Sequence, residues 1–352
     1  MNDQPLASQF LKPLGVSQQF SSQQSSSQQS SSQQSSSPSV STNSLQIELS
    51  QRFLLVFLDG FGLGNAGDHN PLSSADTMPF LSAFLAQPLL ENAAVEREGV
   101  LLKPIDPTLS VEGLPQSATG QTTIYTGQNA PKFLGRHQSG FANGSLRQLI
   151  DEYGLFSQVL RLGKTATLAN AYSPEHFYAI AHRRRRYSVC TLLNLTAHLP
   201  FRMQYEYEKG EAIFWDIVGQ VSSAMNRRSG ERVPITPAES GQRLAALSAR
   251  YDMTLFECYL TDYAGHRQDK AQALACLQRI DAFLESAIAH LPPDVTLIVT
   301  SDHGNVEDLS TKRHTLNTVP LIAIGSNARE FESVEDLTGI APKILSLMGK
   351  CP

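Results

Sequence analysis

Residues 295–305 read Val-Thr-Leu-Ile-Val-Thr-Ser-Asp-His-Gly-Asn, an apolar run that ends in a carboxylate and an imidazole. The run Val295–Val299 is rich in β-branched residues, which predicts a strand buried in a sheet. Asp302 and His303 follow this strand, and His314 comes after a further loop. Because Asp and His side chains are common metal ligands, the stretch predicts a metal site at the carboxyl end of a strand.

Other parts of the chain repeat this pattern of an apolar run followed by polar residues. Further strands are predicted at 52–58, 254–260 and 319–324, and helices at 76–86, 117–126, 270–291 and 334–348. The first two of these strands lead into Asp59 and Asp262. Strands that alternate with helices predict an α/β fold, with a mostly parallel sheet covered by helices on both faces.

Three carboxylates are expected to meet at one edge of this sheet. Ligands bind at the carboxyl ends of parallel strands, so Asp59, Asp262 and Asp302 would lie close together there. Their charges would repel, and divalent cations remove that repulsion. His266 and His314 add imidazoles, which favours zinc or manganese, with magnesium possible. Taken singly, each motif has a plainer interpretation, such as a loop, a helix cap or a surface histidine.

The composition excludes several classes of protein. The net charge of −5 gives no reason to expect binding to nucleic acid or to an anionic membrane. The sequence contains no apolar run long enough to cross a bilayer and no signal-like start. The 4 cysteines are scattered, which argues against a disulfide framework or a thiolate zinc site. We therefore expect a cytoplasmic protein.

Changes in composition predict three regions. Residues 1–44 include repeats of Ser and Gln that cannot bury enough apolar surface to fold, so a disordered tail is predicted. Residues 45–142 and 237–352 are expected to form a catalytic α/β domain. Residues 143–236 are less regular and are interpreted as an inserted cap over the active face. Arg183–Arg186 lie in this cap and could clamp a phosphate, although a solvated basic surface is the simpler interpretation.

The stretch from Gly113 to Gln121 offers a nucleophile. Ser117 and Thr119 lie at a predicted helix start, where free N–H groups and the helix dipole favour a phosphate. A metal can activate such a hydroxyl without a histidine base, whereas the alternative is that Ser117 only caps the helix. Gly62–Gly67 match the G-x-G-x-x-G dinucleotide pattern, but the following residues are typical of a loop and not of a helix.

Together these residues resemble the alkaline phosphatase superfamily, in particular the branch with cofactor-independent phosphoglycerate mutase and phosphopentomutase. The resemblance covers about 53–142 and 254–348. It rests on Asp59 after the first strand, on Ser117 three residues before Gly120, and on three motifs near the C-terminus. These motifs are Asp262-x-x-x-His266, Asp302-His303-Gly304-Asn305 and His314-Thr315 ahead of Asn317 and Val319-Pro320.

The resemblance implies an alkaline-phosphatase-like fold and two divalent metal ions. It assigns one ion to Asp262, His266 and His314, and the other to Asp59, Asp302, His303 and the Ser117 oxygen. Ser117 would attack the phosphorus of a small phosphorylated substrate and form a phosphoserine, which a phosphatase or a phosphomutase then resolves. Lys132, Arg136 and His137 follow the nucleophile helix and are predicted to contact the substrate.

This chain also departs from the resemblance. The mutases carry a His after the Gly of the nucleophile motif, where this chain has Gln121. A sulfatase is disfavoured because Ser117 lacks the Pro-x-Arg that follows the sulfatase nucleophile. The stretch from Thr126 to His137 keeps a phosphodiesterase on the same core as an alternative. A catalytically silent relative that binds a phospholigand is a third possibility. The sequence does not indicate the substrate, the physiological metal or the oligomeric state.

Overall fold

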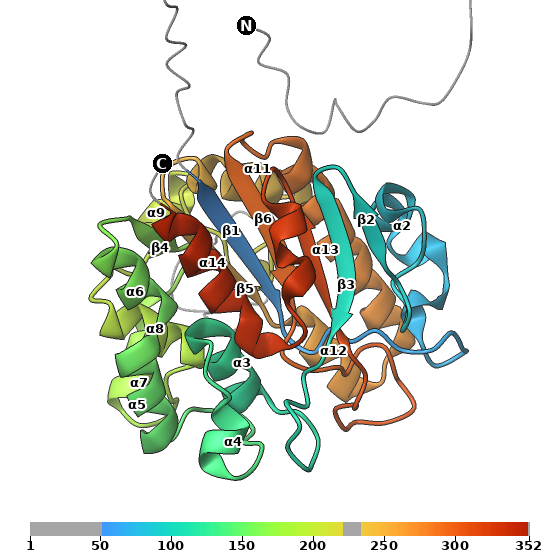
Figure 1. Ribbon diagram of the computed structural model, residues 1–352, viewed down its shortest axis with the longest axis horizontal. Coiled ribbons are helices and arrows are strands. Elements are labelled where there is room, and N and C mark those ends of the chain that lie inside the picture. The colour runs from blue at the N-terminus through green and yellow to red at the C-terminus, as the bar shows by residue number, and fades with distance from the viewer. Residues whose placement is uncertain (1–50, 221–233, 351–352) are drawn as a thin grey trace, which may run out of the picture.

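The computed structural model describes residues 51–220 and 234–350, so the predicted tail at 1–44 lies outside the described residues. A seven-stranded sheet runs through the molecule in the order β2-β3-β7-β6-β1-β5-β4 (Figure 1). The strands are β1 (Arg52–Leu58), β2 (Val95–Arg97), β3 (Val100–Ile105), β4 (Ala166–Leu168), β5 (Met253–Cys258), β6 (Val295–Thr300) and β7 (Val319–Ile324). The α/β class predicted from the sequence is confirmed.

The sheet is mixed, which corrects the prediction of a mostly parallel one. Strands β6, β1, β5 and β4 run parallel, whereas β7 pairs antiparallel with both β6 and β3, and β2 pairs antiparallel with β3. The reason lies between β6 and β7, where the segment 301–318 contains no helix. A parallel return needs a long crossover, whereas a chain that turns back at the same edge must pair antiparallel.

Helices cover both faces of the sheet, as predicted. The helices are α2 (Pro79–Leu85), α3 (Ser117–Thr126), α4 (Ala130–Leu134), α5 (Gly144–Tyr153), α6 (Leu155–Arg161), α7 (Pro174–Ala181), α8 (Val189–Thr196), α9 (Gln204–Glu208), α11 (Pro237–Ser248), α12 (Leu260–Arg267), α13 (Lys270–Ala289) and α14 (Ile340–Gly349). Short 3-10 helices are η1 (Pro71–Ser73), η2 (Ala75–Thr77), η3 (Ala328–Ser333) and η4 (Leu337–Gly339). Figure 1 shows α14 on one side of the sheet and α13 on the other.

The alternation of side chains along β1 explains why both faces are covered. Phe53, Leu55 and Phe57 are buried in one core with α3, α5, α6, α8 and α14. Leu54 and Val56 are buried in a second core, with α2, α11 and α13. Successive residues of a strand point to opposite faces, so a continuous apolar run requires a helix layer on each side.

Some helices begin and end where the sequence predicted, and others do not. The prediction for α3 matches its bounds, and α13 ends two residues earlier than predicted. Asp262 was expected in a loop after a strand, but it lies in the first turn of α12. The predicted closing helix is split into η4 and α14.

The predicted cap at 143–236 remains a prediction, since residues 221–233 lie outside the described residues. Part of this range belongs to the sheet, because β4 pairs in parallel with β5. Helices α5, α6 and α8 of the same range pack into the core beside α3. Within residues 51–220 and 234–350, none of the helices combines the length and the apolar character that a membrane span needs.

Candidate metal centre

The candidate ligands fall into two groups at one edge of the sheet. We call Asp59, Asp302 and His303 the strand-end group, because they follow β1 and β6. We call Asp262, His266 and His314 the helix group, because two of its members lie on α12. Within each group, one potential ligand atom from each side chain lies within 4.8 Å of those of the other two. The structure therefore brings together residues that are far apart in the sequence.

The strand-end group is almost completely buried. The imidazole Nε2 of His303 lies 3.3 Å from Asp59 Oδ1 and 3.6 Å from Asp302 Oδ2. Gln121, from α3, donates from Nε2 to Asp59 Oδ2 at 3.3 Å and to Asp302 Oδ2 at 3.2 Å. Gln121 thus holds the two carboxylates beside each other.

The helix group is oriented by backbone carbonyls. His266 Nδ1 lies 2.7 Å from the Lys312 carbonyl, and His314 Nδ1 lies 2.8 Å from the Pro115 carbonyl. In a neutral imidazole, a ring nitrogen that donates to a carbonyl leaves the other nitrogen as the acceptor. Both Nε2 atoms face Asp262 Oδ1, at 3.3 Å for His266 and 3.5 Å for His314.

The two groups are in contact with each other. The rings of His303 and His314 stack with a centroid separation of 3.6 Å and an interplanar angle of 12°. Asn305 donates from Nδ2 to Asp262 Oδ1 at 2.7 Å, so the segment that carries His303 also bonds to the helix group. The arrangement is one continuous cluster with two binding positions.

Burial and charge repulsion dominate the electrostatics of the strand-end group. Burial, together with the charge of Asp302, raises the pKa of Asp59 well above its ordinary value. Burial also raises the pKa of Asp302, with a contribution from Asp262. Burial alone would lower the pKa of His303, but the surrounding carboxylates raise it to about 10. A positive charge between these carboxylates is therefore strongly favoured.

The helix group has a different balance. Burial opposes ionisation of Asp262, but the hydrogen bond from His266 and the charge of His303 bring its pKa to about 2. Burial and the charge of His303 lower the pKa of His314 to about 4. The ionised Asp262 and the neutral His314 have the protonation state that metal ligation requires, whereas the hydrogen bond to Asp262 raises the pKa of His266.

Ser117 lies next to the strand-end group. It is the first residue of α3, and its Oγ is 3.0 Å from His303 Nε2. The N-cap of α3 is Gln116, so the alternative in which Ser117 caps the helix is wrong. Thr119, the other candidate nucleophile, is fully buried and its hydroxyl bonds to the Gln116 carbonyl and the Gln138 amide. Ser117 is half-buried and can reach a ligand.

Two glycines allow the elements to approach this closely. Gly60 has a φ of +70°, and a Cβ there would lie 2.8 Å from the Asp262 backbone. A Cβ on Gly120 would lie 2.7 Å from the Cβ of Asp302. Any other residue at Gly60 or Gly120 would push α12 or α3 away from the cluster.

Glu307 is a structural carboxylate that the sequence patterns did not identify. It is 2% exposed, and its Oε2 accepts from the amides of Gly62 at 3.2 Å and Asn305 at 2.7 Å. Its Oε1 accepts from Thr315 Oγ1 at 2.5 Å and from Asn317 Nδ2 at 3.0 Å. Glu307 thus ties together the segments that carry Asp59, His303 and His314.

The donor set fits divalent cations. Each group combines carboxylate and imidazole ligands, the set typical of zinc and manganese sites. Asp59 Oδ1 is buried and makes no hydrogen bond of good geometry, although His303 Nε2 is 3.3 Å away. Native structures seldom leave a buried carboxylate oxygen without a partner, and a cation at this position would provide one.

A cavity of about 660 Å³ opens beside the strand-end group. Asp59, Ser117 and Gln121 line it at the cluster, and Arg185 and Arg186 of the arginine run also line it. The three predicted substrate contacts do not line this cavity. Lys132 and Arg136 are exposed, and His137 Nε2 lies 3.2 Å from the Val111 carbonyl. Arg185 and Arg186 line the cavity instead, because the chain turns after α7 and runs towards the cavity.

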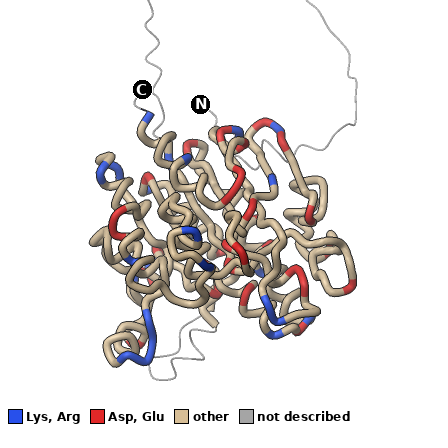
Figure 2. Tube along the Cα trace, turned by 60° about the horizontal axis from the view of Figure 1, so that its bottom comes forward, with Lys and Arg blue, Asp and Glu red and all other residues tan. Residues whose placement is uncertain are grey.

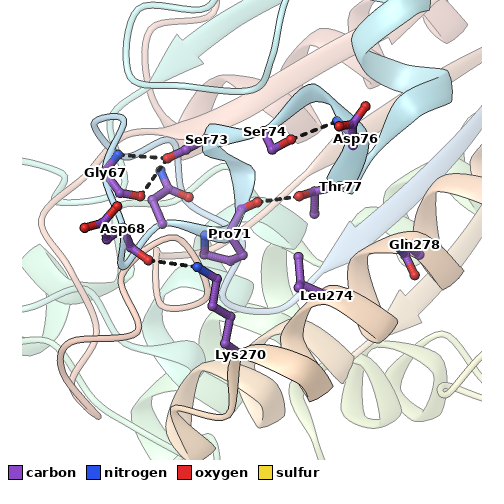
Figure 3. A pocket seen from close by; sticks show the side chains of 11 residues that line it. Gly67, Asp68, Pro71, Ser73, Ser74, Asp76, Thr77, Lys270, Leu274 and Gln278 are labelled. Carbon is purple, nitrogen blue, oxygen red and sulfur yellow. Dashed lines mark hydrogen bonds between the residues drawn. The ribbon is translucent and has the colours of Figure 1, made fainter.

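A second cavity of about 450 Å³ lies against the start of α13 and is drawn in Figure 3. Lys270 Nζ donates to the Asp68 carbonyl at 3.3 Å, and the amide of Gly67 donates to Ser73 Oγ at 2.8 Å. These hydrogen bonds join residues that line the second cavity to one another. The second cavity shares no lining residue with the first. Figure 2 shows Lys and Arg segments interspersed with Asp and Glu segments along the described chain.

Part of the chain matches known proteins in sequence. Residues 239–350 match the model of a family described as the metalloenzyme superfamily. A 2,3-bisphosphoglycerate-independent phosphoglycerate mutase from Yersinia pestis is 32% identical over 124 residues, which cover 32% of this chain and 24% of that protein. The corresponding mutase from Dinoroseobacter shibae is 34% identical over 113 residues, which cover 30% of this chain and 22% of that protein. The chain thus spans about a quarter of the length of these relatives.

The fold has been seen in solved structures. The PH0037 protein from Pyrococcus horikoshii superposes with a TM-score of 0.53 and 14% identity, over 86% of this chain and 98% of that one. At this identity the similarity concerns the fold alone. The match to the metalloenzyme superfamily model runs from α11 to α14. It contains five of the six candidate metal ligands, all except Asp59.

Proposed function

We propose that this chain belongs to the alkaline phosphatase superfamily of metalloenzymes, near the phosphoglycerate mutases that part of it resembles in sequence, and that it transfers phosphoryl groups through a phosphoserine at Ser117. The observation that carries the proposal is the 3.0 Å separation of Ser117 Oγ from His303 Nε2, within a cluster of two ligand groups. A nucleophile that adjoins a candidate metal ligand and opens onto a cavity has the geometry of a phosphoryl-transfer site.

In this proposal Asp59, Asp302 and His303 hold one divalent ion, with Ser117 beside it, and Asp262, His266 and His314 hold the other. When bound, two such cations neutralise the phosphoryl oxygens and lower the pKa of a hydroxyl that they contact. Manganese and zinc suit this ligand set best, and magnesium is the weaker alternative.

The chain itself contributes position and polarity. Ser117 stands at the start of α3, where backbone N–H groups and the helix dipole favour the negative phosphoryl oxygens. Ser117 Oγ attacks phosphorus as the serine hydroxyl loses its proton to water, the bond from phosphorus to the substrate oxygen breaks, and that oxygen takes a proton from water and leaves as the alcohol. Gln121 keeps the Asp59 and Asp302 carboxylates in place during this step.

The second half of the reaction decides the class of enzyme. Water that attacks the phosphoserine gives a phosphatase, and a second substrate hydroxyl gives a phosphomutase. The cavity of about 660 Å³ beside Ser117 can admit either acceptor. We propose a small phosphorylated substrate and a cytoplasmic location.

Intact-mass analysis of the manganese- or zinc-loaded protein tests the proposal. Brief incubation with a phosphomonoester should add one phosphoryl group to the wild type and none to Ser117→Ala. Ser139→Ala is the matched control, because Ser139 is not among the residues that line the cavity. Phosphorylation of Ser117→Ala at an equal level would refute the nucleophile, and turnover of a diester but not of its monoester would identify a phosphodiesterase.

A further inference from the structure

The walls of the cavity beside Ser117 are largely aromatic. Five rings from four segments line it, namely Phe141, Tyr172, Phe214, Trp215 and Tyr259. Trp215 and Tyr259 lie 5.9 Å apart between ring centroids, at an angle of 53°. Flat side chains with few rotatable bonds make a contact surface that loses little entropy when a ligand binds.

Neighbouring residues hold the rings of Tyr172, Phe214 and Tyr259 in place before any ligand binds. Tyr172 makes a hydrogen bond of 3.1 Å with Thr191 Oγ1 and packs edge-on against Phe201 at 5.0 Å. The hydroxyl of Tyr259 donates to the buried Glu257 carboxylate. Phe214 is 2% exposed. The aromatic wall is therefore preformed and does not depend on closure over a ligand.

The wall formed by α7 is polar and has unused hydrogen-bonding capacity. Glu175 and His176 both line the cavity, and Glu175 Oε2 and His176 Nε2 are buried without a hydrogen-bond partner among the described residues. Burial and the nearby charge of Arg185 lower the pKa of His176 to about 4, so its ring is neutral at pH 7. A carboxylate oxygen and a neutral imidazole can pair with both donors and acceptors of a ligand.

The cavity is large for a three-carbon or five-carbon phosphate. Its volume of about 660 Å³ lies in the range typical of sites for drug-sized ligands. A glycerate-sized molecule held at Ser117 would fill only part of this volume. A ligand that reaches from Ser117 to His176 needs a flat apolar body and a polar far edge.

We propose that the substrate is a phosphomonoester whose alcohol carries a planar aromatic ring with hydrogen-bonding groups on its far edge. This inference rests on the proposed function and specifies its substrate class. The phosphoryl group lies at Ser117, the ring lies between the aromatic side chains, and the far edge pairs with Glu175 and His176. Arg185 and Arg186 also line the cavity and favour a ring substituent that carries negative charge or accepts hydrogen bonds.

Trp215 makes this inference testable by binding, because it is the only tryptophan of the chain. Metal-loaded Ser117→Ala protein is titrated with adenosine 5′-monophosphate, phenyl phosphate and glycerol 2-phosphate, and tryptophan fluorescence and heat are recorded. The adenosine and phenyl esters should bind at least about tenfold more tightly than glycerol 2-phosphate and quench Trp215. The adenosine ester should bind most tightly, since it alone presents donors and acceptors on its ring.

Two variants show whether the ring contacts are responsible. Phe141 is 42% exposed, so Phe141→Ala should fold, and it should weaken both ring esters about 3- to 10-fold while leaving glycerol 2-phosphate unchanged. Tyr205→Ala is the matched control, because Tyr205 is 60% exposed and does not line the cavity. It should change none of the affinities.

Equal affinity of the ring esters and glycerol 2-phosphate would overturn the inference, as would an effect of Phe141→Ala on all three ligands alike. These outcomes leave the proposed function intact, because Ser117→Ala cannot turn over and binding is measured without catalysis. Conversely, the absence of a phosphoserine in the wild type would refute the proposed function whatever the binding pattern.

Discussion

The strand-end group and the helix group use similar ligands in different surroundings. In the strand-end group, the side chains of Asp302 and His303 are 0% exposed and that of Asp59 is 8% exposed. In the helix group, the corresponding values are 46% for His266, 20% for Asp262 and 8% for His314. One group follows two central strands, whereas the other depends on a short helix and a loop.

This difference predicts a division of roles. Buried carboxylates that repel each other gain most from a cation, so the strand-end group should hold its metal tightly. The helix group has an already ionised carboxylate and a more exposed imidazole, so its metal should exchange more easily. Substitutions in the strand-end group should therefore have larger and less reversible effects than substitutions in the helix group.

The largest effect is expected for Asp302→Asn. The substitution removes a ligand charge from the buried group, so one metal per chain should be lost and turnover should fall by at least about 10³-fold. Excess metal should not restore it. Metal content by mass spectrometry and steady-state rates across a metal titration check this expectation.

The metal-free protein provides the control for Asp302→Asn. Without a cation the substitution relieves repulsion among buried carboxylates, so the thermal midpoint should rise relative to metal-free wild type. A lower midpoint in the metal-free state would mean that the substitution disrupts the fold, and the lost activity would then say nothing about metal.

Glu257 is a buried carboxylate outside both ligand groups, and it tests whether burial alone raises the pKa of a carboxyl in this fold. It lies on β5, is 1% exposed, and accepts hydrogen bonds from Tyr125 and Tyr259. Burial raises its pKa from 4.5 to about 7. The folded state then binds the proton more tightly than the unfolded state, so this carboxyl lowers the free energy of unfolding as the pH rises from about 5 to 8.

The expected loss from Glu257 is about 3 kcal/mol over this pH range, at about 1.4 kcal/mol per pKa unit. Glu257→Gln should remove that loss. The unfolding free energy of the variant relative to that of the wild type should therefore be higher at pH 8 than at pH 5. Glu332→Gln, at an exposed position, is the control and should show no such shift. Parallel pH profiles for Glu257→Gln and wild type would contradict the prediction.

The sequence predicted the strand-end group better than the helix group, and the reason is physical. An apolar run such as 52–58 has to be a buried strand, so the position of Asp59 follows from the run itself. The direction of β7 and the hairpin β2–β3 depend on contacts between distant segments, which periodicity does not reveal. Asp262 lies on α12, a helix too short to give a clear periodic signal.

Contacts between loops were the least predictable part of the site. Glu307 has no periodic neighbours, and its role becomes visible only when the segments of Gly62, Asn305 and Thr315 are brought together. Arg185 and Arg186 reach the cavity because the turn after α7 returns the chain there. A run of basic residues in the sequence carries no information about that turn.

Glu307→Gln should weaken both groups, because Glu307 bonds to segments that carry members of each. The amide would turn an N–H₂ group towards at least one existing donor and leave a buried donor unsatisfied, at a cost of about 2 kcal/mol. Metal affinity at both positions should fall on the order of 30-fold. Asp308→Asn is the control, since that carboxylate bonds within its own turn to Ser310. Loss of affinity at one position only would show that Glu307 supports a single group.

The smallest effect is expected for His266→Ala, and it separates the two groups most directly. The ring is partly exposed and is one of three candidate ligands, so its loss should raise the metal concentration for half-maximal activity about tenfold. Excess manganese or zinc should restore the rate, because water can enter the open coordination position at this exposed site. His69→Ala, at an exposed position outside both groups, should leave the metal titration unchanged. If metal rescues Asp302→Asn as readily as His266→Ala, burial does not divide the roles of the two groups, and their different exposure has no functional consequence.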